Sequence, residues 1–153
     1  MSKHSTIAYS LFTSGCNCAQ SVFCAFEDVT GFTHDEAMRL SSSFGGGFGR
    51  LREVCGVMSG AAMVAGHLWG YDAPGDDAVK AAHYALIQDI ARRFRERHGT
   101  IVCRELLEGV TEDSSPTPEA RTAEYYKKRP CTQFVVTMTE ILDEIIDERG
   151  GVS

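Results

Sequence analysis

Apolar residues recur at helical spacing along almost the whole chain, and no segment shows the alternation that is typical of a half-buried strand. Residues 5–12 predict a short first helix, and Asn17 is a suitable N-cap for a second helix that runs to about residue 28. Thr33 and Glu36 have the spacing of a capping box at the start of a third helix. The first part of the chain is therefore predicted to be helical.

The segment 54–70 is apolar or small at every position, which is typical of a buried helix. Gly70 is a suitable residue to end it. Small residues such as Gly56 and Gly60 leave parts of its surface without a side chain, so another helix or a prosthetic group could approach the backbone closely. We expect this helix to lie at the centre of the fold.

Three more helices are predicted in the second half of the chain. A long one is capped by Asp76 or Asp77 and stopped by Gly99, and a short one begins at Cys103. A polar connection containing prolines leads to a C-terminal helix that starts near Cys131. The predicted fold is all-α: a single domain of residues 1–153, built as a multi-helix bundle of about six to eight helices around a buried central helix.

The composition excludes several classes of protein. The chain has 153 residues, of which 43% are hydrophobic, so it can form a substantial core. Its net charge of -6 disfavours binding to a phosphate backbone, and we expect no nucleic-acid partner. No segment has the apolar length of a signal peptide or a bilayer span, so we expect a cytoplasmic protein without membrane insertion. The apolar helices of so short a chain also suggest a homodimer.

The glycine-rich loop of residues 44–50 lacks the sequence of a phosphate-binding loop. Arg50 and Leu51 stand where a P-loop has lysine followed by serine or threonine, and a predicted helix precedes the loop where a dinucleotide fold has a strand. Ser59 does not have the glycine spacing of a nucleophile elbow. The histidines form no metal-binding pair, and no Glu-x-x-His motif of a di-iron bundle is present.

Six cysteines are many for a reducing compartment, in which stable disulfides are disfavoured, so they indicate metal binding or redox chemistry. Four of them stand at the predicted start of a helix: Cys18, Cys55, Cys103 and Cys131. Free backbone N–H groups and the helix dipole lower the pKa of a thiol there and donate hydrogen bonds to sulfur. We expect the four to converge on one electron-rich centre.

The sequence gives weaker indications of a metal-binding or redox role for the other two cysteines. Cys24 lies mid-helix between Phe23 and Phe26, where a small buried residue needs no further role. Cys16 is too close to Cys18 for an easy disulfide. It is a spare thiol, a substitute ligand or an unused loop residue.

With these motifs the chain resembles the C_GCAxxG_C_C family, small bacterial proteins that are described as redox-active and named for their cysteine pattern. The likeness covers nearly the whole chain and is carried by the motifs Asn17–Gln20, Phe44–Arg50, Cys55–Gly60, Cys103–Leu106 and Cys131. The chain departs from the pattern at Val57, where the family has alanine, and in having Cys16 and Cys24. The resemblance implies a helical domain with four hallmark cysteines and an iron–sulfur or other redox centre.

Three functions remain as alternatives. In the first, the four cysteines at the helix starts bind an iron–sulfur cluster or another metal, and the protein transfers electrons to or from a redox partner protein. Zinc is the alternative cofactor, less favoured than an iron–sulfur cluster because structural zinc sites usually use close Cys-x-x-Cys pairs. In the second, a metal-free pair such as Cys55 and Cys103 cycles between dithiol and disulfide. In the third, the protein is a non-catalytic helical binding protein.

Glycines are predicted to bring backbone amides close to the cofactor, where hydrogen bonds to sulfur tune its potential. The candidate cofactor-binding glycines are Gly45, Gly46, Gly47, Gly56 and Gly60. No catalytic residue and no reaction follow from the sequence.

Overall fold

Helices account for all the regular elements of the computed structural model, which describes residues 1–152. In chain order they are α1 (Lys3–Thr13), α2 (Cys18–Ala25), α3 (Glu27–Thr30), α4 (His34–Ser41), the 3-10 helix η1 (Ser42–Phe44), α5 (Gly56–Trp69), α6 (Asp77–His98), α7 (Cys103–Leu106), α8 (Ala123–Lys128) and α9 (Cys131–Glu148). Within this part of the chain there is no strand, and the prediction of an all-α single domain is confirmed.

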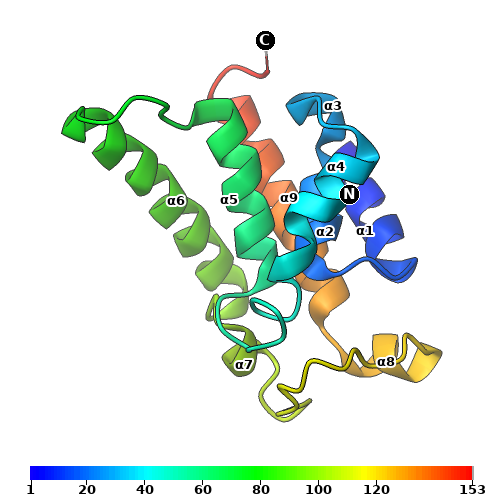
Figure 1. Ribbon diagram of the computed structural model, residues 1–153. Coiled ribbons are helices and arrows are strands. Elements are labelled where there is room, and N and C mark those ends of the chain that lie inside the picture. Colours follow the sequence, from blue (N-terminus) through cyan, green and yellow to red (C-terminus); the bar gives the residue numbers. More distant parts are fainter. Residues whose placement is uncertain (153) are drawn as a thin grey trace.

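Helix α5 lies between α6 on one side and α1, α2 and α4 on the other, with α9 behind it (Figure 1). It packs against α2, α9 and α6, as expected of a buried central helix. The side chains of Phe12, Val22, Val57 and Leu142 are among those fully buried between these helices. Burial of this apolar surface is the main force that holds the bundle together.

The helix ends follow local sequence signals. Asn17 caps α2 and Thr33 caps α4, each in a complete capping box. Asp76, rather than Asp77, caps α6 through its side chain. Gly99 ends the same helix with a φ of 89°, a left-handed conformation that glycine adopts without steric cost.

The second predicted helix is divided at Phe26 instead of continuing to residue 28. Phe26 has a φ of −106° and a ψ of 25°, and its buried ring stacks on His4 at a centroid distance of 4.1 Å. The chain then makes the short helix α3, which ends at Gly31 with a φ of 78°. This turn redirects the chain toward α4, and helical periodicity alone does not reveal it.

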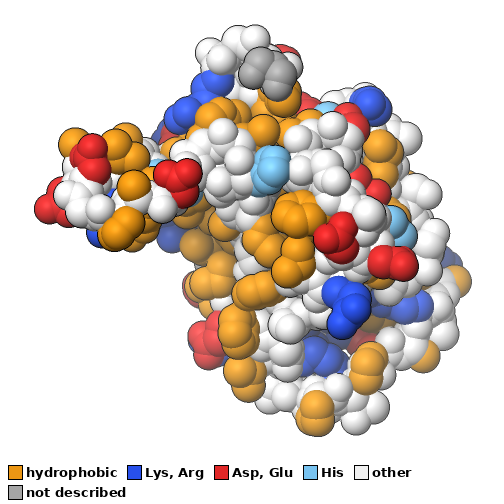
Figure 2. All heavy atoms as spheres, turned by 45° about the horizontal axis from the view of Figure 1, so that its top comes forward, with side chains coloured by type: hydrophobic (Ala, Val, Ile, Leu, Met, Phe, Trp, Pro, Cys, Tyr) orange, Lys and Arg blue, Asp and Glu red, His pale blue; other side chains and the backbone are white. Residues whose placement is uncertain are grey.

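Ion pairs join α6 to α9 along one edge of the bundle. Arg93 contacts Glu148 at 2.6 Å, and Arg97 contacts Glu144 at 2.7 Å. Acidic and basic side chains are interspersed on the face shown in Figure 2, from which the start of α6 projects. Among residues 1–152, no helix has both the length and the apolar character needed to cross a bilayer.

Candidate functional site

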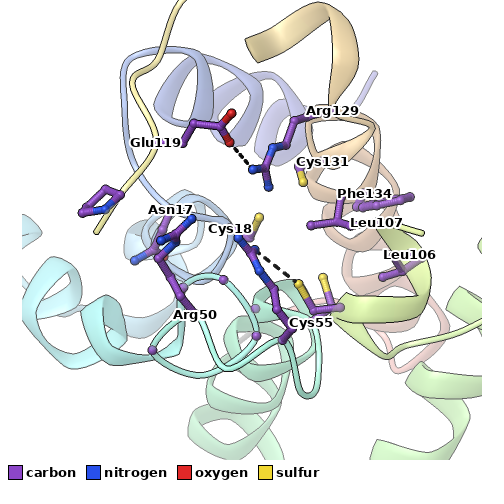
Figure 3. A pocket seen from close by; sticks show the side chains of 18 of the residues that line it. Asn17, Cys18, Arg50, Cys55, Leu106, Leu107, Glu119, Arg129, Cys131 and Phe134 are labelled. Carbon is purple, nitrogen blue, oxygen red and sulfur yellow. Dashed lines mark hydrogen bonds and ion pairs between the residues drawn. The ribbon is translucent and has the colours of Figure 1, made fainter. Parts of the chain in front are cut away.

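Four cysteines line one cavity of about 320 Å³. Cys18, Cys103 and Cys131 are the first residues of α2, α7 and α9, and Cys55 is the N-cap residue of α5. In Figure 3, the labelled side chains of Cys18, Cys55 and Cys131 surround the same space. The structure thus brings together the four thiols that the sequence places at helix starts, while Cys16 and Cys24 do not line this cavity.

A short antiparallel bridge between Val54 and Val102 positions two of these cysteines. The Cys55 N–H donates to the carbonyl of Ile101 at 2.8 Å, and the Cys103 N–H donates to the carbonyl of Glu53 at 2.6 Å. The starts of α5 and α7 are therefore held side by side. A single bridged pair leaves no alternating pattern in the sequence, which is why sequence analysis did not find it.

The glycine loop has an unusual backbone. Gly46 and Gly47 have φ values of 66° and 74°, and three residues with side chains are also left-handed: Phe48, Arg50 and Arg52. Such a conformation costs a non-glycine residue about 1–2 kcal/mol, so it persists only where other contacts fix it. The loop is fixed by its own backbone hydrogen bonds and by the two arginine side chains.

Gly45, Gly46, Gly47 and Gly56 have no room for a Cβ atom, which would lie 3.0 Å or less from another atom at each position. A Cβ atom on Gly47 would lie 2.6 Å from the Cβ of Cys103, and one on Gly56 would lie 3.0 Å from the backbone N of Ala19. Gly45 and Gly46 also line the cavity. Gly60 does not: a Cβ there would lie 2.9 Å from the carbonyl oxygen of Ala19, so this glycine allows α5 to pack closely on α2.

Four arginines line the cavity as well: Arg50, Arg52, Arg121 and Arg129. Arg52 is buried, and its guanidinium donates to the sulfur of Cys103 at 3.8 Å and to the carbonyl of Asp113 at 2.9 Å. Arg129 is also buried and pairs with Glu119, as the dashed line in Figure 3 shows. Glu119 is the one acidic side chain among the lining residues that the structure describes, so the cavity is electropositive.

Arg121 closes the cavity between α1 and α8. Its guanidinium lies 4.6 Å from the ring centroid of Phe12 and 4.9 Å from that of Tyr125. It also donates hydrogen bonds of 3.0 Å to the carbonyls of Phe12 and Cys16. Only Arg50 belongs to a motif noted in the sequence. The other three arginines and α8 were not predicted, because isolated cations in loops carry no periodic signal and their convergence depends on the tertiary fold.

The four thiols differ in acidity. A hydrogen bond with the Cys18 thiol lowers the pKa of Cys131 below its usual value, and the charge of Arg129 acts in the same direction. The same hydrogen bond raises the pKa of Cys18. Burial raises the pKa values of Cys55 and Cys103, the latter against the opposing effect of Arg52.

The expectation that a helix start lowers the pKa of each thiol is therefore wrong for Cys18, Cys55 and Cys103. The hydrogen bond with Cys131 has the largest effect on the pKa of Cys18, and removal of the thiolate from water has the largest effect at Cys55 and Cys103. Repulsion between neighbouring sulfurs acts in the same direction, and together these effects outweigh the helix dipole. Only Cys131 among the four has the lowered pKa that the sequence predicted.

The spacing of the sulfurs bears on what the cavity can hold. In residues 1–152, no three of the four cavity sulfurs lie within 4.8 Å of one another. Four thiolates around a single zinc ion would be roughly 3.8 Å apart, given Zn–S bonds of about 2.3 Å in a tetrahedron. The arrangement is therefore wider than a single zinc ion requires.

A family model described as "Putative redox-active protein (C_GCAxxG_C_C)" matches residues 16–145. The chain belongs to this family. The matched region contains all four cavity cysteines, the glycine loop and the cavity arginines. No curated protein and no solved structure matches the chain.

Proposed function

We propose that the protein binds an iron–sulfur cluster through Cys18, Cys55, Cys103 and Cys131 and uses it in electron transfer. The observation that carries this proposal is that all four thiols line one cavity at the starts of four helices. Four cysteine thiolates are the usual ligand set of [2Fe–2S] and [4Fe–4S] clusters. A bound cluster would supply reversible one-electron chemistry.

The charges around the cavity suit an anionic group. Four thiolates give a bound cluster a net negative charge, and the arginines of the lining would offset it. Arg52 already donates to the sulfur of Cys103. Hydrogen bonds and cations near the sulfurs stabilise the reduced cluster and so raise its potential.

The thiols must lose their protons to become ligands. Cys55 and Cys103 retain their protons in the metal-free protein because of burial and mutual repulsion. Iron would remove this penalty by neutralising the thiolates, so binding releases protons and becomes tighter as the pH rises. Gly45, Gly46, Gly47 and Gly56 line the cavity, so their backbone borders the space that such a group would fill.

The surface beside the cavity supports docking of a redox partner protein. Phe48, Leu51 and Val54 are exposed apolar residues on the segment that carries the glycine loop, with exposed fractions of 53%, 57% and 43%. Apolar side chains of this kind are typical of contact surfaces. A cytoplasmic location also belongs to this proposal, because all six cysteines are free and a reducing compartment keeps them so.

Purification without oxygen, followed by visible absorption and counts of iron, sulfide and zinc, tests the cluster. We expect a coloured protein with iron and sulfide in equal amounts. Cys55→Ser should lose the colour, whereas Cys16→Ser, which alters a cysteine outside the cavity, should keep it. Stoichiometric zinc, or a colourless protein that takes up no iron and sulfide on reconstitution, would sink the proposal.

A second candidate function rests on the pairing of Cys18 with Cys131. The Cys131 thiolate would attack a disulfide of a partner protein and release one partner thiolate; Cys18 would then attack the mixed disulfide. Two electrons and two protons pass to the partner, and a Cys18–Cys131 disulfide remains. The lowered pKa of Cys131, which comes from its interaction with the Cys18 thiol, favours this pair over Cys55 and Cys103. Peptide mapping of the oxidised, metal-free protein would identify the disulfide.

A further inference from the structure

A second group of metal-binding side chains lies outside the cavity. Cys24, Glu27 and His34 each offer one ligand atom, and these three atoms lie within 4.8 Å of one another. No other set of three or more such side chains in residues 1–152 meets this distance. Cys24 belongs to the body of α2, whereas the other two are the first residues of α3 and α4, whose ribbons adjoin in Figure 1.

We propose that Cys24, Glu27 and His34 form a zinc site that is separate from the cysteine cavity. Thiolate, carboxylate and imidazole are the three protein ligand types that zinc accepts, and a mixed set of this kind suits it better than magnesium or calcium. The site does not depend on the proposed cluster, since Cys24 does not line the cavity.

The site can close around an ion with little movement. Zinc bonds would place the three ligand atoms roughly 3.3–3.6 Å apart in a tetrahedron. The Nδ1 atom of His34 already lies 2.6 Å from a carboxylate oxygen of Glu27. The side chains of His34 and Glu27 are 54% and 29% exposed, so both can shift toward the fixed sulfur of Cys24.

The exposure of these ligands also determines whether water can reach a bound ion. Three protein ligands leave the fourth tetrahedral position to water, which can reach it past the exposed imidazole. A bound ion would tie α2, α3 and α4 together across the turns at Phe26 and Gly31. Zinc should therefore stabilise the folded protein by preferential binding to the native state.

Zinc titration of the metal-free protein against a chelating dye tests the site. We expect His34→Gln and Cys24→Ser each to bind one equivalent of zinc fewer than the wild type. His67→Gln changes another exposed histidine and Cys16→Ser another thiol, so both should retain the full count. Zinc should also raise the unfolding temperature of the wild type and leave that of His34→Gln less changed.

The Cys55→Ser variant separates this site from the cavity. The double variant Cys55→Ser/His34→Gln should bind one equivalent of zinc fewer than Cys55→Ser, whatever number of zinc ions the cavity binds. Equal zinc counts in the wild type and in His34→Gln would overturn the proposal. His34 is exposed, so that variant is expected to fold and the result does not depend on the buried Cys24→Ser change.

Discussion

The helical core and the cavity are built in different ways. In the core, apolar side chains such as Val22, Val64 and Leu142 are fully buried between α1, α2, α5 and α9. Around the cavity, cations donate to backbone carbonyls, and a loop with a left-handed backbone approaches Cys103 at Gly47. Stability therefore resides mainly in the core, whereas the shape of the site depends on backbone geometry and hydrogen bonds.

The largest expected effect is in the core. Leu142→Ala removes a fully buried side chain and should lower the free energy of unfolding by about 2–5 kcal/mol. Leu40→Ala is the matched control, since Leu40 is 52% exposed, and its effect should stay within about 0.5 kcal/mol. Urea denaturation of the metal-free proteins measures both. If both variants lose a similar amount of unfolding free energy, the buried core does not carry most of the stability.

The next effect tests the glycine loop. Gly47→Ala places a methyl group 2.6 Å from the Cβ of Cys103 at a φ of 74°, and should cost roughly 2–3 kcal/mol through strain and overpacking. Gly49→Ala has a similar φ of 57° but no atom nearer than 3.9 Å, so its cost should be about 1 kcal/mol.

Measuring both the iron content and the free energy of unfolding of these two variants separates an effect on the metal site from an effect on stability. We expect Gly47→Ala to lose far more iron than Gly49→Ala, because its methyl group displaces a ligand. If both variants take up iron equally, the close approach of Gly47 to Cys103 has no role in binding.

The smallest expected effect is the pH dependence of stability that arises from His4 on α1. Burial lowers the pKa of His4, but hydrogen bonds to Asp143 and Asp28, at 2.7 Å and 3.0 Å, outweigh it and raise the pKa. These hydrogen bonds stabilise the folded protein fully at pH values below the ordinary histidine pKa of about 6.5. The stabilisation is lost as the pH rises through the higher pKa of His4 in the folded protein. The unfolding temperature should thus fall from pH 6 to pH 8, and fall less in His4→Asn. An identical slope in both proteins would exclude His4 as the cause.

The sequence was informative wherever a local signal determines structure. The N-cap at Asn17, the capping box at Thr33 and the glycine stop at Gly99 place three helix ends correctly. Cys55, Cys103 and Cys131 also stand at helix starts, as predicted, although no side-chain cap marks these three starts. Helix boundaries that a side-chain cap or a glycine marks can be predicted without the tertiary fold, whereas the break at Phe26 has no such signal.

The rest depends on contacts between distant residues. Arg121 meets the carbonyls of Phe12 and Cys16, which are far from it in sequence, and no periodic pattern indicates such a contact. The pKa values of Cys55 and Cys103 depend on burial, which outweighs the local helix dipole. The sequence predicts that Gly60 approaches a cofactor, whereas in the structure Gly60 lies against α2, where a Cβ atom would be 2.9 Å from the carbonyl oxygen of Ala19. These features require knowledge of which elements meet.

The bridge between Val54 and Val102 has a consequence for how the site is assembled during synthesis. It joins the two ends of the antiparallel helical hairpin formed by α5 and α6, so Cys55 and Cys103 meet only after that hairpin has folded. Long-range contacts of this kind form late, because the intervening chain must first be ordered. Cys131 comes later still in the chain, at the start of α9. A chain that ends before residue 131 therefore offers only three of the four cavity thiols, so the site cannot be complete until the start of α9 has been synthesised.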